Sequence, residues 1–368
     1  MLRNYMGIIN LEESEKNIRS LTNFRPVGTI PVAGKYRVID FTLSNMVNAG
    51  LRHISVFCKK ETRSLPDHLG AGRPWDLDRK NDGLFVFQHS LLGGDSSLDA
   101  KLFAHNMEFI NRSNCEYAIV SSSYMIANVD LEAVAKAYEE SGADICVVYK
   151  NIDDAKDNFL NCDLLKLDEN NNVVNVVKNI GGEEKAAVCA EMFVLKTKTL
   201  QELMYKAITN GVRKGFNHFV YDNINAYSVV GYEFKGYLSC INSIESYYAM
   251  NMDMLNIEKV GELFSRNRPI YTKSKDAPPA VYCEESDVKN SIVADGTIVK
   301  GKIRDSVISR KVRIGKDVDL DGCIVLQNAV IKDGVKLRNV IVDKGVTVDE
   351  NTVIQGQKEY PIVLEKKR

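Results

Sequence analysis

The sequence has no closely spaced pair of cysteines, no long apolar run and no excess of charge of either sign, and each absence excludes a class of protein. Its eight cysteines are scattered without a CxxC pair, so neither a zinc site nor a disulfide framework is indicated. No apolar run approaches the ~20 residues that a membrane-spanning helix requires, and the N-terminus lacks a secretory apolar segment. The 48 Lys and Arg residues balance 49 Asp and Glu residues, giving a formal net charge of -1. We therefore expect a cytoplasmic protein that binds neither nucleic acid nor membrane.

The 368 residues, 45% of them hydrophobic, are enough for two or three packed domains. The first part of the chain alternates β-rich runs with amphipathic helical stretches, which predicts an α/β domain with a largely parallel sheet. We expect strands at residues 5–9, 54–57, 117–120 and 145–149, and helices at residues 43–49, 98–112 and 131–141. Asp130 and Gly142 are suited to cap the last of these helices. A polar, proline-containing stretch at residues 261–280 predicts a linker after a first domain of residues 1–260.

Aliphatic residues with a period of six dominate residues 281–368. The spacing is clearest at Val312, Val318, Ile324 and Val330, and glycines fall between such residues at 296, 301, 315, 322, 334 and 345. One aliphatic side chain per six-residue turn predicts a β-helix, in which the inward side chain of each short strand stacks on the next coil. Hexad β-helices also occur in acyltransferases that use a histidine base, but no histidine follows His218, which disfavours that reaction.

The loop after the first expected strand contains no glycine. It reads NLEESEKN over residues 10–17 and includes three carboxylates, Glu12, Glu13 and Glu15. Glycine-rich loops let backbone N–H groups approach phosphates, whereas a carboxylate about 5 Å from a phosphate charge costs roughly 3 kcal/mol at an effective dielectric near 20. We therefore expect this loop to repel a triphosphate. The alternative is an ordinary solvated loop that leads into a helix.

Longer motifs are spread over nearly the whole chain. They include GKYRVIDFTLSN at residues 34–45, PWDLDR at residues 74–79, SIESYY at residues 243–248 and RNRPI at residues 266–270. These stretches closely resemble glucose-1-phosphate adenylyltransferase, also called ADP-glucose pyrophosphorylase. The resemblance implies a nucleotidyltransferase α/β domain followed by a left-handed parallel β-helix of hexapeptide repeats at residues 281–368.

The positions that bind the triphosphate, the metal and the sugar phosphate in that family are changed here. The resemblance places Glu12, Glu13 and Glu15 at the three glycines of a GGxGxR motif, and Asn17 at its arginine. The other changed positions are Val27 for a phosphate-facing lysine, Ser123 for a metal-binding aspartate, His218 and Cys240 for two acids, and 178–180 for the EKP motif that meets the sugar phosphate. Mg²⁺ prefers hard carboxylate oxygens, for which serine, histidine and cysteine are poor replacements.

These changes imply a chain with no catalytic residues and no cofactor. The resemblance is then to the GlgD-type, non-catalytic branch of the family, which serves glycogen biosynthesis as a regulatory subunit. It implies pairing with a catalytic glucose-1-phosphate adenylyltransferase subunit in a hetero-oligomer, as in the tetramers of the family.

Five cationic residues are effector candidates under the same resemblance. Arg25, Lys35 and Arg37, joined by Lys311 and Arg313, match or lie near positions that contact anionic effectors, so a sugar phosphate is the implied ligand. The alternative is that they form salt bridges, for example to Asp40 or to neighbouring subunits.

Two other functions stay open from the sequence. A weakly active adenylyltransferase would convert ATP and glucose 1-phosphate to ADP-glucose and pyrophosphate, with Mg²⁺ held by a residual carboxylate such as Asp95, Asp99 or Asp222. A free-standing sensor would instead bind a sugar phosphate or a nucleotide sugar without turnover.

Overall fold

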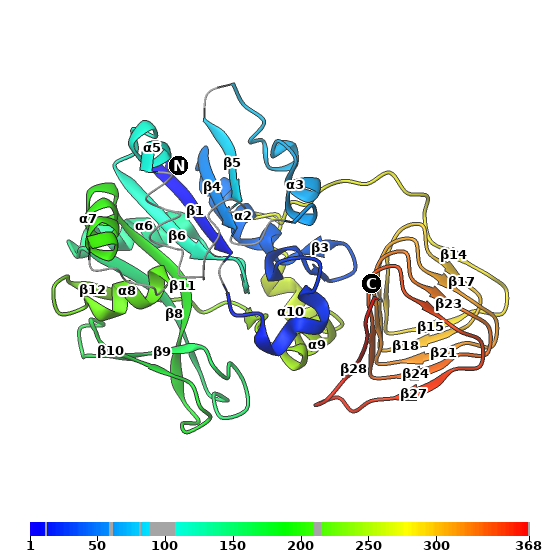
Figure 1. Cartoon of the computed structure of the whole chain (residues 1–368). Coiled ribbons are helices and arrows are strands. Elements are labelled where there is room, and N and C mark those ends of the chain that lie inside the picture. The colour runs from blue at the N-terminus through cyan, green and yellow to red at the C-terminus, as the bar shows by residue number, and fades with distance from the viewer. Residues whose placement is uncertain (12, 59–61, 81, 89–106, 210–214, 367–368) are drawn as a thin grey trace. The chain divides into compact units, whose positions relative to one another are not determined.

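The computed structural model describes residues 1–11, 13–58, 62–80, 82–88, 107–209 and 215–366 (Figure 1). The chain forms two compact units. The first contains Met1–Glu13, Phe41–Cys240 and Ser265–Tyr271, and the second contains Ser14–Asp40, Ile241–Phe264 and Thr272–Arg368. The second unit therefore joins the C-terminal repeats to two segments that the sequence pattern assigned to the first domain.

The first unit is built on a nine-stranded mixed sheet. Its strand order is β10-β9-β11-β6-β1-β4-β5, and β8 lies between β11 and β12. The strands are β1 (Tyr5–Leu11), β4 (His53–Cys58), β5 (Gly83–Gln88), β6 (Tyr117–Ser122), β8 (Ile145–Ile152), β9 (Asp163–Leu167), β10 (Val173–Lys178), β11 (Ala186–Lys196) and β12 (Val229–Glu233). β5, β4, β1 and β6 run parallel, and β11 runs antiparallel to β6. Met6, Ile8 and Ile9 of the central strand β1 are all buried, as expected for a strand that is covered on both faces.

Helices of the first unit follow the predicted β-α-β alternation. They are α2 (Val38–Asn48), which begins in the second unit, α3 (Ser64–Leu69), α5 (Met107–Arg112), α6 (Leu131–Ser141), α7 (Thr197–Thr209) and α8 (Phe216–Asp222). The predicted caps of α6 are confirmed, because the Asp130 carboxylate accepts from the Ala133 N–H at 3.1 Å and Gly142 has a φ of 65°. Of the helix predicted at residues 98–112, positions 98–106 lie outside the described residues.

The C-terminal part of the second unit is a β-helix, coloured yellow to red in Figure 1. Three five-stranded parallel sheets form its sides, in the orders β14-β17-β20-β23-β26, β15-β18-β21-β24-β27 and β16-β19-β22-β25-β28. The first sheet consists of β14 (Val281–Tyr282), β17 (Ile298–Val299), β20 (Arg313–Ile314), β23 (Val330–Ile331) and β26 (Thr347–Val348). The second consists of β15 (Asp287–Lys289), β18 (Lys302–Arg304), β21 (Asp319–Asp321), β24 (Lys336–Arg338) and β27 (Val353–Gln355). The third consists of β16 (Ile292–Val293), β19 (Val307–Ile308), β22 (Ile324–Val325), β25 (Val340–Val342) and β28 (Ile362–Leu364).

Inward aliphatic side chains form one continuous core along this β-helix. Ile303, Leu320 and Leu337 stack in register along the second sheet and are at most 2% exposed. The predicted fold class, a nucleotidyltransferase domain followed by a left-handed parallel β-helix, is confirmed. Glycine marks only some of the corners, because Asn339 and Asn351 also adopt positive φ there, a conformation that asparagine tolerates better than most residues.

Short N-terminal elements and two helices complete the second unit. They are η1 (Lys16–Ile18), α1 (Arg19–Thr22), η2 (Val27–Thr29), β2 (Pro31–Val32), β3 (Tyr36–Arg37), α9 (Ile244–Asp253) and α10 (Ile257–Leu263). Tyr247 Oη donates to the Pro31 carbonyl, and Tyr248 Oη donates to the Gly322 carbonyl of the β-helix, each at 2.7 Å. Among the described residues, no helix combines the length and the apolar character that crossing a bilayer requires.

Candidate functional site

The carboxyl ends of β1 and β6 bring two of the predicted site residues together. The two strands are parallel neighbours, with Asn10 beside Ser122, so the chain leaves both at the same edge of the sheet, where α/β folds bind ligands. Glu13 follows β1 and Ser123 follows β6. One oxygen of the Glu13 carboxylate, Oε1, accepts hydrogen bonds from the backbone N–H and from the hydroxyl of Ser123, both at 2.7 Å. A residue at an expected phosphate-loop position thus bonds to the residue at the expected metal-ligand position.

A second carboxylate, Glu191 of β11, lies in the same polar neighbourhood. Its side chain is buried and accepts a hydrogen bond from Tyr124 Oη. Burial and then the negative charge of Asp163 raise the pKa of Glu191 from 4.5 to about 7, and the Glu13 charge acts in the same direction. Glu191 has a φ of 51°, within the stretch where the register of β11 on β8 shifts. Such backbone costs a non-glycine residue roughly 1–2 kcal/mol, so the surrounding structure must hold it in place.

Asp163 and Lys178 form an ion pair beside Glu191. Lys178 Nζ lies 2.6 Å from Asp163 Oδ1, and the Asp163 side chain is only 4% exposed. Partial burial lowers the pKa of Lys178, but the Asp163 carboxylate outweighs that effect and raises it above the ordinary lysine value. Asn179 is buried, and its side-chain amide donates to the Ala155 carbonyl at 2.8 Å, which ties residue 179 to residue 155. Lys178 and Asn179 are therefore used in internal contacts, whereas Ile180, at the third position that the resemblance aligns with EKP, is 86% exposed.

The acidic groups of this region do not fit a Mg²⁺ ion. Ser123 offers a neutral hydroxyl that already donates to Glu13, and Asp163 is paired with Lys178. Mg²⁺ needs several oxygen ligands in octahedral geometry, usually including one or two carboxylates. Within the described ranges no three His, Cys, Asp or Glu side chains are grouped so that they could hold a metal ion.

The other positions at which the resemblance places replaced family residues, and the three carboxylates kept for a weakly active enzyme, are dispersed. His218 is exposed on α8, near Tyr221, and Asp222 is exposed on the same helix. Cys240 is buried at the end of β13 (Leu238–Cys240), and burial raises the pKa of its thiol well above the ordinary value. Positions 12, 95 and 99, which hold Glu12, Asp95 and Asp99, lie outside the described residues. Glu15, Asn17 and the buried Val27 belong to the second unit.

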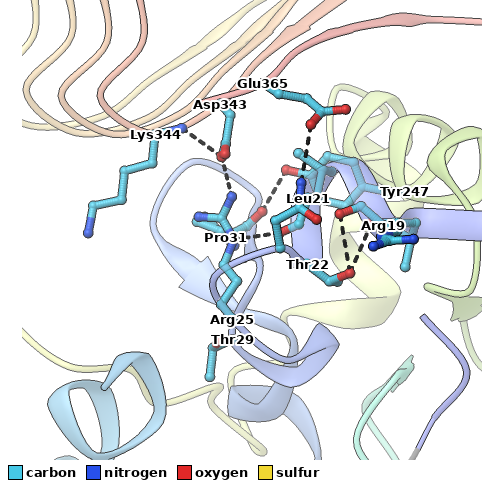
Figure 2. A network of polar contacts seen from close by, with 12 residues as sticks. Arg19, Leu21, Thr22, Arg25, Thr29, Pro31, Tyr247, Asp343, Lys344 and Glu365 are labelled. Atoms are coloured by element: carbon cyan, nitrogen blue, oxygen red, sulfur yellow. Dashed lines mark hydrogen bonds and ion pairs between the residues drawn. The ribbon is translucent and has the colours of Figure 1, made fainter. Parts of the chain in front are cut away.

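Arg25 has a buried acidic partner in the second unit. Figure 2 shows its guanidinium directed at the Asp343 carboxylate, with which Nη2 forms an ion pair, and Nε donates to the Leu21 carbonyl at 2.7 Å. The two side chains are 9% and 5% exposed. Arg37 Nη1 donates to the Thr29 carbonyl at 2.9 Å, and the Arg37 backbone N–H donates to Asp40 at 2.8 Å.

The remaining effector candidates lie on exposed surface. Lys35 Nζ lies 5.0 Å from the centre of the Tyr36 ring. Lys311 occupies an exposed β-helix corner with a φ of 57°. Arg313 is on the outer side of β20, because its neighbour Ile314 belongs to the core.

Three further cations lie near Arg25 and Arg37. Burial and then the charge of Arg37 lower the pKa of Lys275 from 10.5 to about 8, and Lys344 and Arg310 add to this effect. Lys344 is exposed, but partial desolvation of its ammonium and then the charges of Arg37 and Arg25 likewise lower its pKa. We call Arg25, Arg37, Lys275, Arg310 and Lys344 the cationic cluster. Sequence reasoning missed its last three members, because no motif marks them and only the folded second unit brings them to the N-terminal arginines.

Arg310 has an unsatisfied donor. Arg310 is only 8% exposed, and its Nε has no hydrogen-bond partner among the described residues. Neighbouring cations that lower one another's pKa repel each other, and a bound anion would reduce this repulsion. The same anion could accept a hydrogen bond from the unsatisfied N–H of the buried guanidinium.

Two family models match the chain. The model described as "Nucleotidyl transferase" matches residues 16–159, and the model described as "GlmU-like, C-terminal hexapeptide" matches residues 278–360.

Curated relatives match along most of the chain. "Glycogen biosynthesis protein GlgD" of Bacillus subtilis (strain 168) is 34% identical over 369 residues, which cover 100% of this chain and 97% of the relative. A protein of the same name from Geobacillus stearothermophilus is 32% identical over 84% of this chain and 81% of the relative. "Glucose-1-phosphate adenylyltransferase" of Fervidobacterium nodosum is 26% identical over 91% of this chain and 86% of the relative.

Proposed function

The chain belongs to the family of GlgD glycogen biosynthesis proteins, and from this premise we propose that it serves glycogen biosynthesis as a regulatory, non-catalytic subunit. Its partner in this proposal is a catalytic glucose-1-phosphate adenylyltransferase subunit, with which it forms a hetero-oligomer. The similarity to adenylyltransferases over 91% of the chain supports a partner of the same fold.

The observation that carries the non-catalytic assignment is the bond between Glu13 and Ser123. A carboxylate beside a triphosphate site would repel the phosphates of ATP. Here the Glu13 carboxylate also accepts the hydrogen bonds that the backbone N–H and the hydroxyl of Ser123 could otherwise donate to a phosphate. A phosphate group would have to break both hydrogen bonds and to approach Glu13 without a metal ion between them. No cofactor is therefore part of the proposal.

We expect the purified chain to release pyrophosphate from ATP and glucose 1-phosphate, with Mg²⁺, no faster than a protein-free control. The same chain, mixed with a catalytic adenylyltransferase from the same source, is expected to co-purify with it and to change its rate or its response to effectors. A steady-state pyrophosphate assay with each subunit alone and with both measures this. Robust release by the chain alone would favour the weakly active enzyme. Binding of ADP-glucose with no effect on the catalytic subunit would favour the sensor.

We further propose that the cationic cluster binds an anionic effector such as a sugar phosphate. The depressed pKa of Lys275 and Lys344 and the free N–H of Arg310 support this site. Lys344 is the member to replace, because it is exposed and makes no side-chain ion pair among the described residues.

Fructose 1,6-bisphosphate, used as a probe, is expected to bind at pH 7 about tenfold more weakly to Lys344→Ala, since one charge contact of this kind is worth roughly 1.4 kcal/mol. Binding is also expected to weaken as the pH rises through 8, because Lys275, whose pKa is about 8, loses its charge there. Isothermal titration calorimetry at pH 7 and pH 9 measures both effects. Lys336→Ala, on an exposed charged face of the β-helix, is the control. Equal affinities for both variants at both pH values would exclude the site.

A further inference from the structure

Two cysteines that are far apart in the sequence meet in the first unit. Cys162 directly precedes β9, and Cys240 is the last residue of β13. Both belong to the first unit, and their side chains are hydrogen-bonded to one another. Cys162 is 0% exposed and Cys240 is 3% exposed. The fold thus brings together two buried thiols that no spacing in the sequence marks as a pair.

Two other buried thiols have partners that are not thiols. Cys189 Sγ accepts a hydrogen bond from Tyr221 Oη at 3.3 Å. Cys323 Sγ donates to the Leu337 carbonyl at 3.3 Å. A thiol–thiol contact is therefore not a general consequence of burying cysteine in this chain.

Backbone hydrogen bonds fix the positions of the two cysteines. The Cys162 carbonyl accepts from the Asn179 N–H at 2.9 Å. Cys240 is paired with Met125 in the antiparallel ladder between β13 and β7 (Met125–Ala127). The sulfur atoms of a disulfide are about 2 Å apart, so two thiols that are already in hydrogen-bond contact have only a short distance to close.

The surroundings make the two thiols unequal. Burial and then the contact with Cys162 raise the pKa of Cys240 well above the ordinary value, and the charges of Glu191 and Glu13 act in the same direction. The Lys178 ammonium, by contrast, interacts with Cys162. Because the thiolate is the species that reduces a peroxide, we expect Cys162 to react first and Cys240 to complete the bond.

We propose that Cys162 and Cys240 form a reversible intrachain disulfide when the chain meets hydrogen peroxide, and that this bond ties the start of β9 to the end of β13. The O–O bond breaks as the Cys162 sulfur is oxidised to a sulfenic acid, and one water leaves. The Cys240 sulfur then forms the S–S bond and displaces a second water, so that two electrons and the two thiol protons pass to the peroxide. A dithiol reverses the step by thiol–disulfide exchange and is itself oxidised to a cyclic disulfide.

Mass spectrometry of the full chain tests this bond without a catalytic partner, so the result is independent of the proposed function. After treatment with hydrogen peroxide, the denatured chain is expected to lose two of its eight alkylatable thiols, and peptide mapping is expected to find Cys162 joined to Cys240. Dithiothreitol should restore all eight. The urea midpoint followed by Trp75 fluorescence should be roughly 1 M higher for the oxidised chain, because a closed loop restricts the unfolded first unit.

Replacement variants separate this pair from the other thiols. Cys162→Ala and Cys240→Ala are each expected to abolish both the loss of two thiols and the shift of the urea midpoint. Cys283→Ser removes a partly buried thiol of the second unit and is expected to keep both effects. Peptide mapping of the wild-type chain decides the question even if an alanine variant does not fold.

Three results would overturn the proposal. The first is that wild-type Cys162 and Cys240 both remain alkylatable after the peroxide treatment. The second is that they are oxidised to sulfinic or sulfonic acids, which dithiothreitol does not reverse. The third is that the oxidised chain unfolds at the same urea concentration as the reduced chain.

Discussion

Asp343→Ala is expected to lower the free energy of unfolding of the second unit by about 3–5 kcal/mol. Arg25 and Asp343 form a buried ion pair, and removal of the carboxylate would leave the guanidinium buried without its acid. The single tryptophan, Trp75, lies in the first unit, so its fluorescence reports that unit, whereas far-ultraviolet circular dichroism also follows the β-helix. Urea denaturation recorded with both signals measures the loss and locates it.

The control for this prediction is an exposed pair on the same β-helix. Lys332 Nζ lies 2.7 Å from Asp349 Oδ1, but the Asp349 side chain is 81% exposed, so Asp349→Ala should cost less than about 1 kcal/mol. The double replacement R25M/D343L should cost much less than Asp343→Ala, because neither charge is then left alone. If Asp343→Ala and Asp349→Ala lower the free energy of unfolding by similar amounts, the buried Arg25–Asp343 pair stabilises the fold no more than an exposed pair does.

The second large effect is a dependence of stability on pH that originates at Glu191. Its pKa in the folded chain is raised from 4.5 to about 7, so the folded state holds a proton that the unfolded state releases between these values. The free energy of unfolding therefore falls as the pH rises from about 4.5 to 7, by about 3 kcal/mol in total. Glu191→Gln keeps the oxygen that accepts from Tyr124 and removes the titration, so this decline should disappear.

Trp75 fluorescence during urea denaturation at pH 5, 6, 7 and 8 measures the Glu191 effect, because both residues lie in the first unit. Glu183→Gln is the matched control. It removes an exposed carboxylate that pairs with Lys166 at 2.6 Å and should leave the pH dependence as in the wild type. An unchanged decline in Glu191→Gln would place the titrating group elsewhere.

Local patterns were enough to predict much of the fold. The α6 caps at Asp130 and Gly142 could be read from the sequence because a cap acts within one helical turn. Glu191 could not be found in the same way. Its neighbours in sequence are strand residues, and its contact with Tyr124 spans 67 positions, so neither its burial nor its raised pKa leaves a local signal.

What the sequence by itself determined is the order of the domains and the hexad β-helix, since both depend on residue type and short-range period. Only the tertiary structure decided which partners the candidate site residues have. Glu13 turns to Ser123, and Arg25 meets Asp343 across 318 positions of the chain. The reason is physical: hydrophobic period is imposed by local geometry, whereas the partner of a charged side chain is fixed only when distant segments pack and exclude water between them.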